Sequence, residues 1–277
     1  LAVKNLKKLM VIDTSTNGLI PSKIEKTTLS IMDEVKPPLF AIGVSLDGMK
    51  EQNDRIRGVK DSFERAFETY KKLREIAEQY DSFQTHLNDT ISAYNAGKFP
   101  DFFKKFNEYS RCEGFDIRPE DISISIADTG VQWNTNQNDE HILIKDTIAA
   151  IEDINFLLKN SRQRLSLKLK ENRFLVKRIF LNLVKKYLSK PSEMVLPCAS
   201  CFATAFIDPY GNVGACLVDK IHLGNIREVG FHFQKIWFSK RAEEVRKMVK
   251  KGICARCWNG CESWSSIMNN FPWAIRY

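Results

Sequence analysis

LFAIGVSL, residues 39–46, is an almost unbroken apolar run with Pro37-Pro38 before it and Asp47-Gly48 after it. An apolar run of this length between turn-forming residues is typical of a strand that is buried on both faces, and such strands belong mostly to parallel sheets. We therefore expect a strand at 39–46 inside a parallel sheet.

Strand and helix patterns alternate on both sides of this run. We expect further strands at 8–14, 82–87 and 122–127, and helices at 21–35, 62–80, 101–109, 145–159 and 163–188. Asp61 and Glu64 have the spacing of an acceptor cap and a second acid at the start of the helix at 62–80. Repeated strand–helix–strand units need parallel strands with right-handed crossovers. The predicted fold class is α/β, either an open doubly wound sheet or a barrel.

Positive charge is concentrated in one segment. The net charge is +8, and Glu171 is the only acid between Lys159 and Lys190. A surface for nucleic acid or an acidic partner has this composition, and so does the solvated face of a long helix. Apolar residues recur at helical spacing between the charges, from Val176 to Tyr187, which favours the helix. We therefore do not expect a nucleic acid as a partner.

The N-terminus carries no targeting signal that we recognise. Three lysines precede the first apolar run, so a signal peptide is not indicated, and no stretch approaches the roughly 18 apolar residues of a membrane-spanning helix. The chain begins at Leu1 and reaches a strand-like run, LMVI, at 9–12. We interpret it as a fragment of a longer cytoplasmic protein that has no membrane partner.

Six of the seven cysteines lie close together near the C-terminus. They are Cys198, Cys201, Cys216, Cys254, Cys257 and Cys261, whereas Cys112 stands alone. A disulfide scaffold would be shorter and would follow a secretion signal, so metal binding in a reducing compartment is favoured. A turn at 208–212 between two short strands predicts a hairpin that returns Cys216 toward Cys201. The spacing alone does not decide between zinc and an iron–sulfur cluster.

Beyond the boundary that we place at 190, the sequence resembles a known domain. Nine residues separate Cys201 from Gly211 and four separate Gly211 from Cys216. LGNI at 223–226, IWFS at 236–239 and the distal cysteines follow. From residue 198 to about 265 this pattern resembles the SPASM domain, or its shortened twitch form, which holds an auxiliary iron–sulfur cluster.

The resemblance implies which cysteines bind the cluster. Carried over by position, one 4Fe–4S cluster would be held by Cys198, Cys201, Cys216 and Cys261. Cys254 and Cys257 would then belong to an incomplete second site, or would replace Cys198 and Cys261 in a single twitch-like cluster. Four of the six cysteines is the smallest ligand set that the resemblance requires.

The first half resembles the core of radical S-adenosylmethionine (radical SAM) enzymes. VSLDG at 44–48 and NDRIRG at 53–58 are similar to this family's SLDG and HDxxRG pair, and STNG at 15–18 is similar to the end of one of its strands. The resemblance implies that Ser45 and Arg57, twelve residues apart, bind the methionine carboxylate of SAM, with Asn17 and Asn95 as further contacts. A strand-end hydroxyl and a guanidinium are suited to grip a carboxylate.

Two departures from the radical SAM pattern limit what this chain can do. Asn53 stands where the family usually has His, so no imidazole chemistry is expected there. The chain contains no C-x3-C-x2-C triplet, which in the family holds the 4Fe–4S cluster that binds SAM. By family order the triplet would lie upstream of Leu1, so we expect the full-length protein, and not this fragment, to start radical chemistry.

The resulting expectation is a partial (β/α)6 TIM-like radical SAM barrel at 1–190 and a small cysteine-rich α+β domain at 191–277. The resemblance implies that a 5′-deoxyadenosyl radical abstracts hydrogen from a peptide or protein, with one or two auxiliary 4Fe–4S clusters and an electron donor such as a flavodoxin or ferredoxin. Leu217 stands where the sulfatase-maturing branch has an acidic base, so no catalytic residue is assigned. The alternative is a non-enzymatic zinc- or iron–sulfur-binding module that binds a partner or transfers electrons.

Overall fold

The computed structural model describes residues 8–127, 143–160, 169–190, 193–218, 221–254 and 256–277. The chain divides into two compact units, Leu1–Ser125 and Ile126–Tyr277. The segment at 126–190, which we expected in the barrel domain, belongs by its contacts to the C-terminal unit. The domain boundary at 190 stays a prediction.

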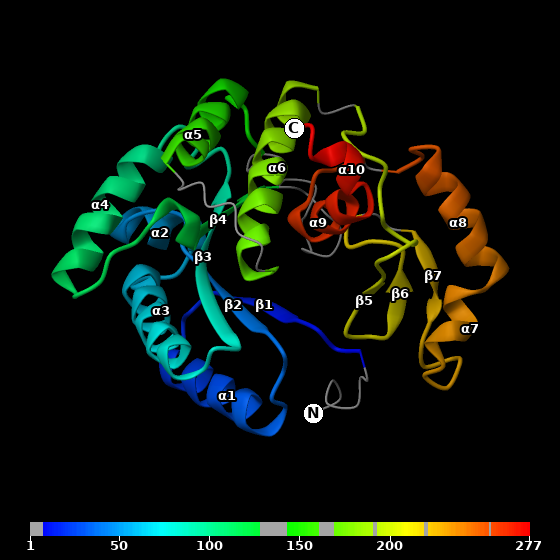
Figure 1. Ribbon diagram of the computed structural model, residues 1–277, viewed down its shortest axis with the longest axis horizontal. Coiled ribbons are helices and arrows are strands. Elements are labelled where there is room, and N and C mark those ends of the chain that lie inside the picture. Colours follow the sequence, from blue (N-terminus) through cyan, green and yellow to red (C-terminus); the bar gives the residue numbers. More distant parts are fainter. Residues whose placement is uncertain (1–7, 128–142, 161–168, 191–192, 219–220, 255) are drawn as a thin grey trace. The chain divides into compact units, whose positions relative to one another are not determined.

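The N-terminal unit is built on a four-stranded sheet in which the strands follow chain order, β1-β2-β3-β4 (Figure 1). The strands are β1 (Ile12–Thr16), β2 (Phe40–Ser45), β3 (Phe83–Ile91) and β4 (Ile122–Ile126). β1 pairs with β2, and β2 with β3, in parallel registers that place Gly43 between Ser15 and His86. The predicted strands are present, and the parallel pairing that we expected is confirmed for these neighbours.

Four helices connect these strands. They are α1 (Pro21–Glu34), α2 (Lys50–Arg57), α3 (Ser62–Gln79) and α4 (Phe99–Cys112). α1 and α3 contact each other on the same side of the sheet, and α3 contacts β2 and β3 (Figure 1). α1, α3 and α4 agree with the prediction, whereas α2 was not predicted. Its sequence, KEQNDRIR, is almost wholly polar and buries only Asn53.

The two faces of the sheet differ because side chains alternate along each strand. Buried apolar side chains occupy the face toward α3: Phe40, Ile42, Val44 and Leu87. Small and polar residues alternate with them on the opposite face: Asp13, Ser15, Gly43, Ser45, Gln84, His86 and Asn88. The helices therefore cover an apolar layer, and the other face of β1, β2 and β3 is chemically equipped to bind a polar molecule.

Aromatic rings hold α4 against α3. The rings of Phe67 and Tyr109 lie 4.9 Å apart and those of Phe63 and Tyr109 lie 5.5 Å apart, both edge to face. Phe106 packs edge-on against Phe63 and Phe67 and is fully buried. Ring pairs of this kind add about 0.5–1.5 kcal/mol each beyond the area that they bury.

The C-terminal unit combines a small sheet with helices. Its elements are α5 (Thr147–Asn160), α6 (Leu169–Ser189), β5 (Phe206–Ile207), β6 (Asn212–Gly214), β7 (His222–Asn225), α7 (Phe233–Trp237), α8 (Lys240–Lys250), α9 (Gly260–Asn269) and α10 (Phe271–Ala274). The sheet order is β5-β6-β7 with antiparallel pairs. The predicted hairpin is confirmed, and Gly211 has a φ of 89° in its turn, a conformation that favours glycine. β7 and the helices after it were not predicted.

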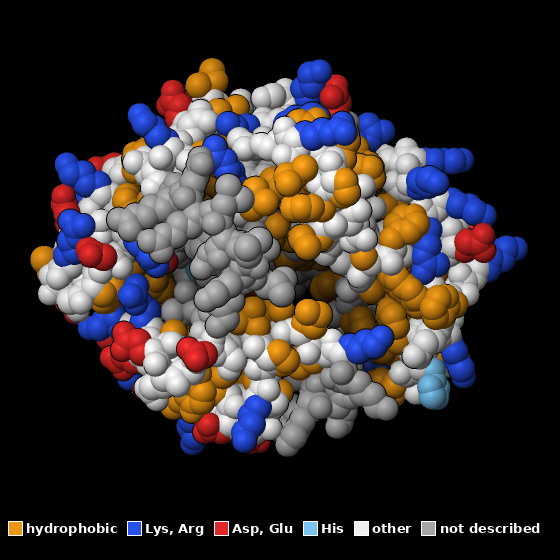
Figure 2. Space-filling model, viewed as in Figure 1, with side chains coloured by type: hydrophobic (Ala, Val, Ile, Leu, Met, Phe, Trp, Pro, Cys, Tyr) orange, Lys and Arg blue, Asp and Glu red, His pale blue; other side chains and the backbone are white. Residues whose placement is uncertain are grey.

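The basic segment forms α6, as its helical spacing predicted. Its apolar side chains are buried: Val176, Ile179, Phe180, Leu183 and Val184. Lys185 Nζ donates to Asn155 Oδ1 at 3.1 Å, and Lys186 Nζ donates to the Tyr277 hydroxyl at 3.0 Å. Figure 2 shows lysine and arginine side chains interspersed with acids on the face that it displays. None of the helices in the described ranges has the length and apolarity needed to cross a membrane.

Candidate functional site

Four cysteines from three segments line one cavity within the C-terminal unit. They are Cys198, Cys216, Cys254 and Cys257, and the cavity has a volume of about 40 Å³. Cys198 precedes β5, Cys216 follows β6, and the other two lie between α8 and α9. All four side chains are half-buried. The predicted convergence of distant cysteines is therefore present for these four.

The other two clustered cysteines do not line this cavity. Cys201 is fully buried in an apolar cluster with Val213, Ala242 and Val245, and its Sγ lies 3.8 Å from the Ala242 carbonyl oxygen. Burial raises the pKa of the Cys201 thiol, and the nearby Arg246 guanidinium lowers it in part. Cys261 is exposed in the first turn of α9. Their assignment as ligands stays a prediction.

A single zinc ion and a 4Fe–4S cluster require different spacings of four cysteine sulfurs. Around one tetrahedral zinc, with Zn–S bonds of about 2.3 Å, the sulfurs lie about 3.8 Å apart. In the described part of the chain, the one group of three or more potential ligands within 4.8 Å of one another is Asp54, Asp61 and Glu64, which contains no cysteine. Each cysteine of a 4Fe–4S site binds a different iron, so its sulfurs stand farther apart. Among the described residues, no three of the four cavity cysteines have sulfurs within 4.8 Å of one another.

Trp258 supplies a second indication that the cavity receives a ligand. It lines the cavity, is 6% exposed, and its ring stacks on Phe180 at 6.1 Å. Its indole Nε1–H is buried and has no hydrogen-bond acceptor among the described residues. A buried donor without an acceptor is costly, and the inorganic sulfides of a cluster are acceptors. The donor set of the cavity therefore fits an iron–sulfur cluster.

The turn that carries Cys198 and Cys201 is held by α9 on one side. Ser266 Oγ accepts from the Ala199 backbone N–H at 3.0 Å, and Asn270 Nδ2 donates to the Pro197 carbonyl oxygen at 3.0 Å. Glu262 Oε2 accepts from Ser200 Oγ and from Thr204 Oγ1, both at 2.7 Å. These bonds join segments more than 50 residues apart, so no local sequence pattern could have indicated them.

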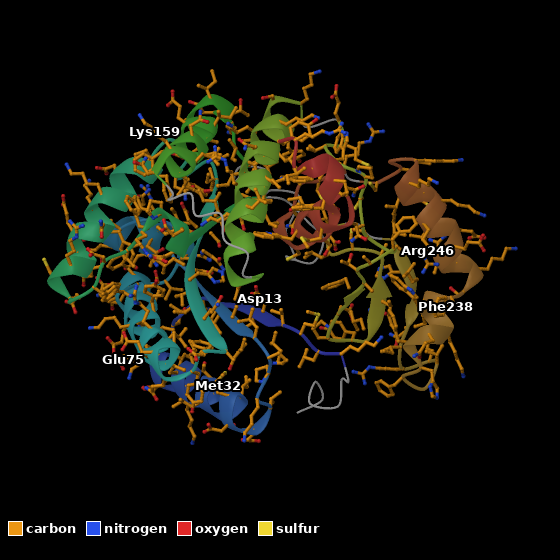
Figure 3. All side chains as sticks on the ribbon, in the orientation of Figure 1. Asp13, Met32, Glu75, Lys159, Phe238 and Arg246 are labelled. Atoms are coloured by element: carbon orange, nitrogen blue, oxygen red, sulfur yellow. The ribbon has the colours of Figure 1, made fainter. Side chains whose placement is uncertain are left out.

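Arg246 on α8 (Figure 3) holds the same turn from a second helix. Its Nε donates to the Cys201 carbonyl oxygen and its Nη2 to the Trp237 carbonyl oxygen, both at 2.7 Å. Its guanidinium also lies 4.7 Å from the centre of the Trp237 ring. A planar fork that binds two carbonyls at once is a role that lysine does not reproduce. Hydrogen bonds from two helices thus hold the cysteine turn.

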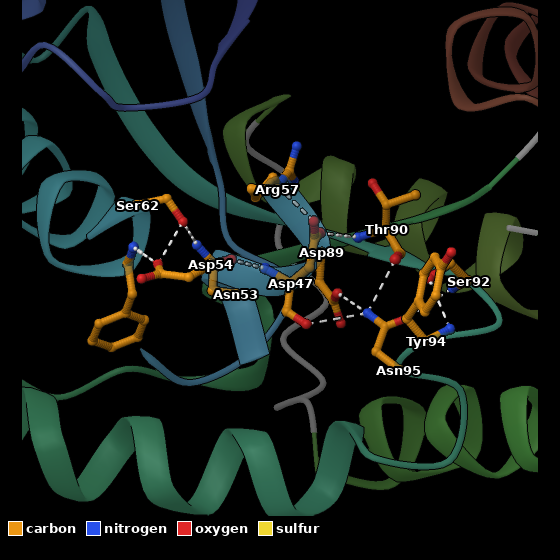
Figure 4. A network of polar contacts seen from close by, with 11 residues as sticks. Asp47, Asn53, Asp54, Arg57, Ser62, Asp89, Thr90, Ser92, Tyr94 and Asn95 are labelled. Atoms are coloured by element: carbon orange, nitrogen blue, oxygen red, sulfur yellow. Dashed lines mark hydrogen bonds and ion pairs between the residues drawn. The ribbon is translucent and has the colours of Figure 1, made fainter. Parts of the chain in front are cut away.

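A buried polar network follows β2 in the N-terminal unit (Figure 4). Asp47 Oδ1 accepts from the Thr90 backbone N–H at 2.9 Å, and Asp47 Oδ2 forms a 2.6 Å ion pair with Arg57 Nε. Burial raises the pKa of Asp47, although the Arg57 guanidinium lowers it in part. Ser45, two residues before Asp47, ends β2 and is half-buried beside Asn88 of β3. The structure thus places Arg57, a predicted cofactor residue, within this network, and Ser45, another, two residues before Asp47 at the end of β2.

Asn53 has a structural position in this network. Its Oδ1 accepts from the Asp47 backbone N–H and its Nδ2 donates to Ser62 Oγ, both at 2.8 Å. With 1% exposure it joins the end of β2 to the start of α3. Asn53 therefore uses both ends of its amide inside the chain.

Asn95, a predicted cofactor contact, is also buried. Its Nδ2 donates to Asp89 Oδ1 at 2.9 Å, and its Oδ1 accepts from the Ser92 backbone N–H at 2.7 Å (Figure 4). Asn17 is exposed, and its Oδ1 accepts from the Leu19 backbone N–H at 3.2 Å. Both are held by local hydrogen bonds, and their contact with a cofactor stays a prediction.

Sequence reasoning missed one group on the polar face of the sheet. Asn88 Nδ2 on β3 donates to Ser15 Oγ on β1 at 3.2 Å, across the intervening β2. A Cβ at Gly43 would collide with the Asn88 amide and would lie 2.9 Å from His86 Nε2. Glycine is therefore required beneath these two side chains. The alternation of β3, FQTHLNDTI, was the signal that could have indicated them.

One family model matches part of the chain. It is the SPASM family, described as an iron–sulfur cluster-binding domain, and it covers residues 197–258. These residues include Cys198, Cys201, Cys216, Cys254 and Cys257, and the four cavity cysteines are among them. No curated protein has a matching sequence.

Solved structures of anSMEcpe have a similar fold. Native anSMEcpe with bound AdoMet matches with a TM-score of 0.52 and 15% identity, covering 86% of this chain and 59% of that chain. Native anSMEcpe with bound AdoMet and Cp18Cys peptide matches with a TM-score of 0.53 and 17% identity, covering 88% and 62%. The chain thus spans about three-fifths of the length of these proteins. The likeness confirms the predicted fold class, an α/β partial barrel with a small cysteine-rich α+β region.

Proposed function

We propose that this chain, which carries a SPASM iron–sulfur cluster-binding domain at residues 197–258, is the greater part of a radical SAM enzyme that modifies a peptide or protein. The observation that carries the proposal is the cavity in which Cys198, Cys216, Cys254 and Cys257 meet inside that domain. The fold shared with anSMEcpe, whose structures contain AdoMet and peptides, supports the cofactor and the substrate class.

The C-terminal unit would hold the auxiliary 4Fe–4S cluster, which supplies electron transfer close to the substrate when it is bound. The chain's own part is to fix the ligands. Arg246 and Glu262 hold the turn that carries Cys198 and Cys201, and the hairpin of β5 and β6 places Cys216 at the cavity. The ring of Trp258 keeps water from the buried side of the cavity. One cluster accounts for the four cavity cysteines, and a second is not needed.

The N-terminal unit would bind the methionine carboxylate of SAM through Ser45 and Arg57. Asp47 takes the Nε side of the Arg57 guanidinium, at 2.6 Å, and so orients the fork. The Nη groups can then donate to a carboxylate as a bidentate pair. Asp47 is itself fixed by Thr90 and by Asn53, so the arginine is anchored in an ordered network.

The radical-forming cluster requires a C-x3-C-x2-C triplet, which is absent from these 277 residues. This chain covers 59% of the length of anSMEcpe, and a radical-forming cluster would need a triplet outside these 277 residues. When bound there, the cluster would reduce SAM to release the radical that abstracts hydrogen from the substrate. A reducing cytoplasm and a flavodoxin or ferredoxin as electron donor complete the proposal.

The substrate chemistry is expected to differ from that of the sulfatase-maturing branch. Leu217 directly follows Cys216, at the position where that branch has an acidic base. Leucine accepts no proton, so another group must serve if the reaction needs a base. The proposed substrate class remains a peptide or protein.

Two measurements test this function. Anaerobic reconstitution of the 277-residue chain should give a brown protein with roughly four irons, as expected for one cluster. A colourless protein with stoichiometric zinc would instead favour the non-enzymatic module. The full-length protein, reduced in the presence of SAM, should release 5′-deoxyadenosine, and an R57A variant should bind SAM more weakly. Iron binding without SAM cleavage in the full-length protein would favour an electron-transfer role.

A further inference from the structure

A hydrogen-bonded chain runs from a cavity cysteine to a buried carboxylate. Cys198 Sγ lies 3.2 Å from Ser200 Oγ, and Ser200 Oγ donates to Glu262 Oε2 at 2.7 Å. All three residues line the cavity. Ser200 is 2% exposed and Glu262 is 6% exposed. This arrangement links one predicted cluster ligand to a single acid through a single hydroxyl.

The burial of Glu262 needs compensation because a carboxylate removed from water is costly unless it accepts hydrogen bonds. The described contacts supply two, from Ser200 and from Thr204, and both go to the same oxygen, Oε2. Thr204 lies on the same turn but does not line the cavity. Both hydroxyls donate to Glu262, but of the two only the Ser200 hydroxyl has a described contact with the Cys198 sulfur.

The hydroxyl of Ser200 has one hydrogen to donate. A carboxylate at 2.7 Å competes for it with a sulfur at 3.2 Å, and bonds to ionised acceptors are the stronger ones. A metal-bound Cys198 is a thiolate and has no hydrogen of its own. Among the described contacts, the Cys198 sulfur would then accept a hydrogen bond only from the Ser200 backbone N–H, at 3.5 Å. Glu262 thus prevents the Ser200 hydroxyl from donating a hydrogen bond to the Cys198 sulfur.

We propose that Glu262 is a positioning residue for the auxiliary cluster, which holds the Ser200 hydroxyl hydrogen away from Cys198 and so keeps the reduction potential of the cluster low. The proposal rests on the function proposed above. Hydrogen bonds to ligating sulfurs and local charge are two of the means by which a protein sets the potential of an iron–sulfur cluster. Glu262 acts through both, because it removes a donor and adds a buried negative charge.

The test is a redox titration, followed by electron paramagnetic resonance, of the reconstituted 277-residue chain and its variants. E262Q keeps the shape of the side chain and removes the charge, so a neutral amide oxygen competes less strongly with the Cys198 sulfur for the Ser200 hydrogen. We expect its midpoint potential to move to a more positive value with iron content unchanged. S200A should leave the potential close to that of the parent chain, since the hydroxyl does not donate to the sulfur. In the S200A background, the effect of E262Q should shrink to the part due to charge alone.

Matched controls separate this role from a structural one. T204A removes the other hydroxyl that Glu262 binds, and E244Q removes an exposed charge from α8, so both should leave the potential unchanged. The proposal is overturned if E262Q retains iron without a positive shift, or if S200A by itself moves the potential to a more negative value. If E262Q does not retain its cluster, a negative shift in S200A still overturns the proposal. Failure of the parent chain to bind iron would instead count against the proposed function.

Discussion

The Asp54 carboxylate caps α3 from the preceding helix, since its Oδ1 accepts a hydrogen bond from the Phe63 backbone N–H at 3.1 Å. Oδ2 accepts from the Asp61 backbone N–H at 2.7 Å, and Ser62 Oγ donates to Oδ1 at 2.8 Å. The cap that we predicted, Asp61 with Glu64, is wrong, because Asp61 has a φ of 57° and its side chain makes no capping bond. The acid of the HDxxRG-like motif therefore has a structural role.

Replacing Asp54 by alanine should destabilise the N-terminal unit by about 1–2 kcal/mol, because it leaves the first backbone N–H groups of α3 without acceptors. Urea unfolding measures the effect. Burial raises the pKa of Asp54, but the hydrogen bonds from Ser62, Phe63 and Asp61 bring it below its ordinary value of 3.8. The stabilisation is therefore complete above pH 3.8 and is lost as the pH falls through the lower folded value.

The control is D61N, which tolerates the left-handed conformation and leaves the Asp54 cap in place. It should change the unfolding free energy by less than about 0.5 kcal/mol. If D61N were as destabilising as D54A, the cap would belong to Asp61 after all.

Asp47 should show the opposite dependence on pH. Its folded pKa lies above its ordinary value of 3.8 because burial outweighs the attraction of Arg57. The folded state therefore holds the proton more tightly, and the contribution of Asp47 to stability is largest below pH 3.8 and declines as the pH rises through the folded value. D47N keeps the acceptor for the Thr90 N–H and does not titrate. The difference in unfolding free energy, wild type minus D47N, should fall as the pH rises above 3.8, and a rise would contradict the assignment.

Much of the fold could be predicted from the sequence because local patterns determine it. The apolar run at 39–46 and the alternation at 122–126 became β2 and β4, and the turn at 208–212 became the hairpin of β5 and β6. α2 could not be predicted in this way. It has no apolar face, and its place is set by bonds from Asn53 and Asp54 to residues of other elements.

The sequence predicted which kind of residues form the candidate site, but it did not predict which of them lie together. The spacing of the cysteines indicated metal, but it did not show that Cys254 and Cys257 line a cavity with Cys198 while Cys201 points into an apolar cluster. Glu262 had no local signal, because it meets Ser200, 62 residues earlier, only through the tertiary fold. Long-range hydrogen bonds of this kind cannot be predicted from the spacing of residues in the sequence.

Arg246 should be sensitive to the conservative change to lysine. An ammonium cannot bind the Cys201 and Trp237 carbonyls in the fixed geometry of the guanidinium, and one half-buried carbonyl loses its donor. We expect R246K to lower the unfolding free energy of the metal-free chain by about 1–3 kcal/mol in urea titrations. R241K, at an exposed site on the same helix, is the control and should change it by less than about 0.5 kcal/mol. If R246K and R241K lowered the unfolding free energy equally, the two hydrogen bonds of the Arg246 guanidinium would not contribute specifically to stability.

The cysteines should differ in what their loss does to iron binding. Cys198 and Cys216 belong both to the ligand set implied by the SPASM resemblance and to the cavity, so C198A and C216A should each lose most of the iron after anaerobic reconstitution. Cys112 is exposed and lies on α4 in the other unit, so C112A should keep the full complement.

C257A and C261A then separate the two ligand sets. If the cavity cysteines bind the cluster together, C257A loses iron and C261A retains it, because Cys261 is exposed outside the cavity. If instead C261A loses iron and C257A retains it, Cys261 is a cluster ligand and Cys257 is not. Iron content and the absorbance of the reconstituted variants decide between them, with circular dichroism of each metal-free variant to show that the fold is retained. Retention of iron by C198A and C216A together would contradict both ligand sets and remove the basis for a cluster at this cavity.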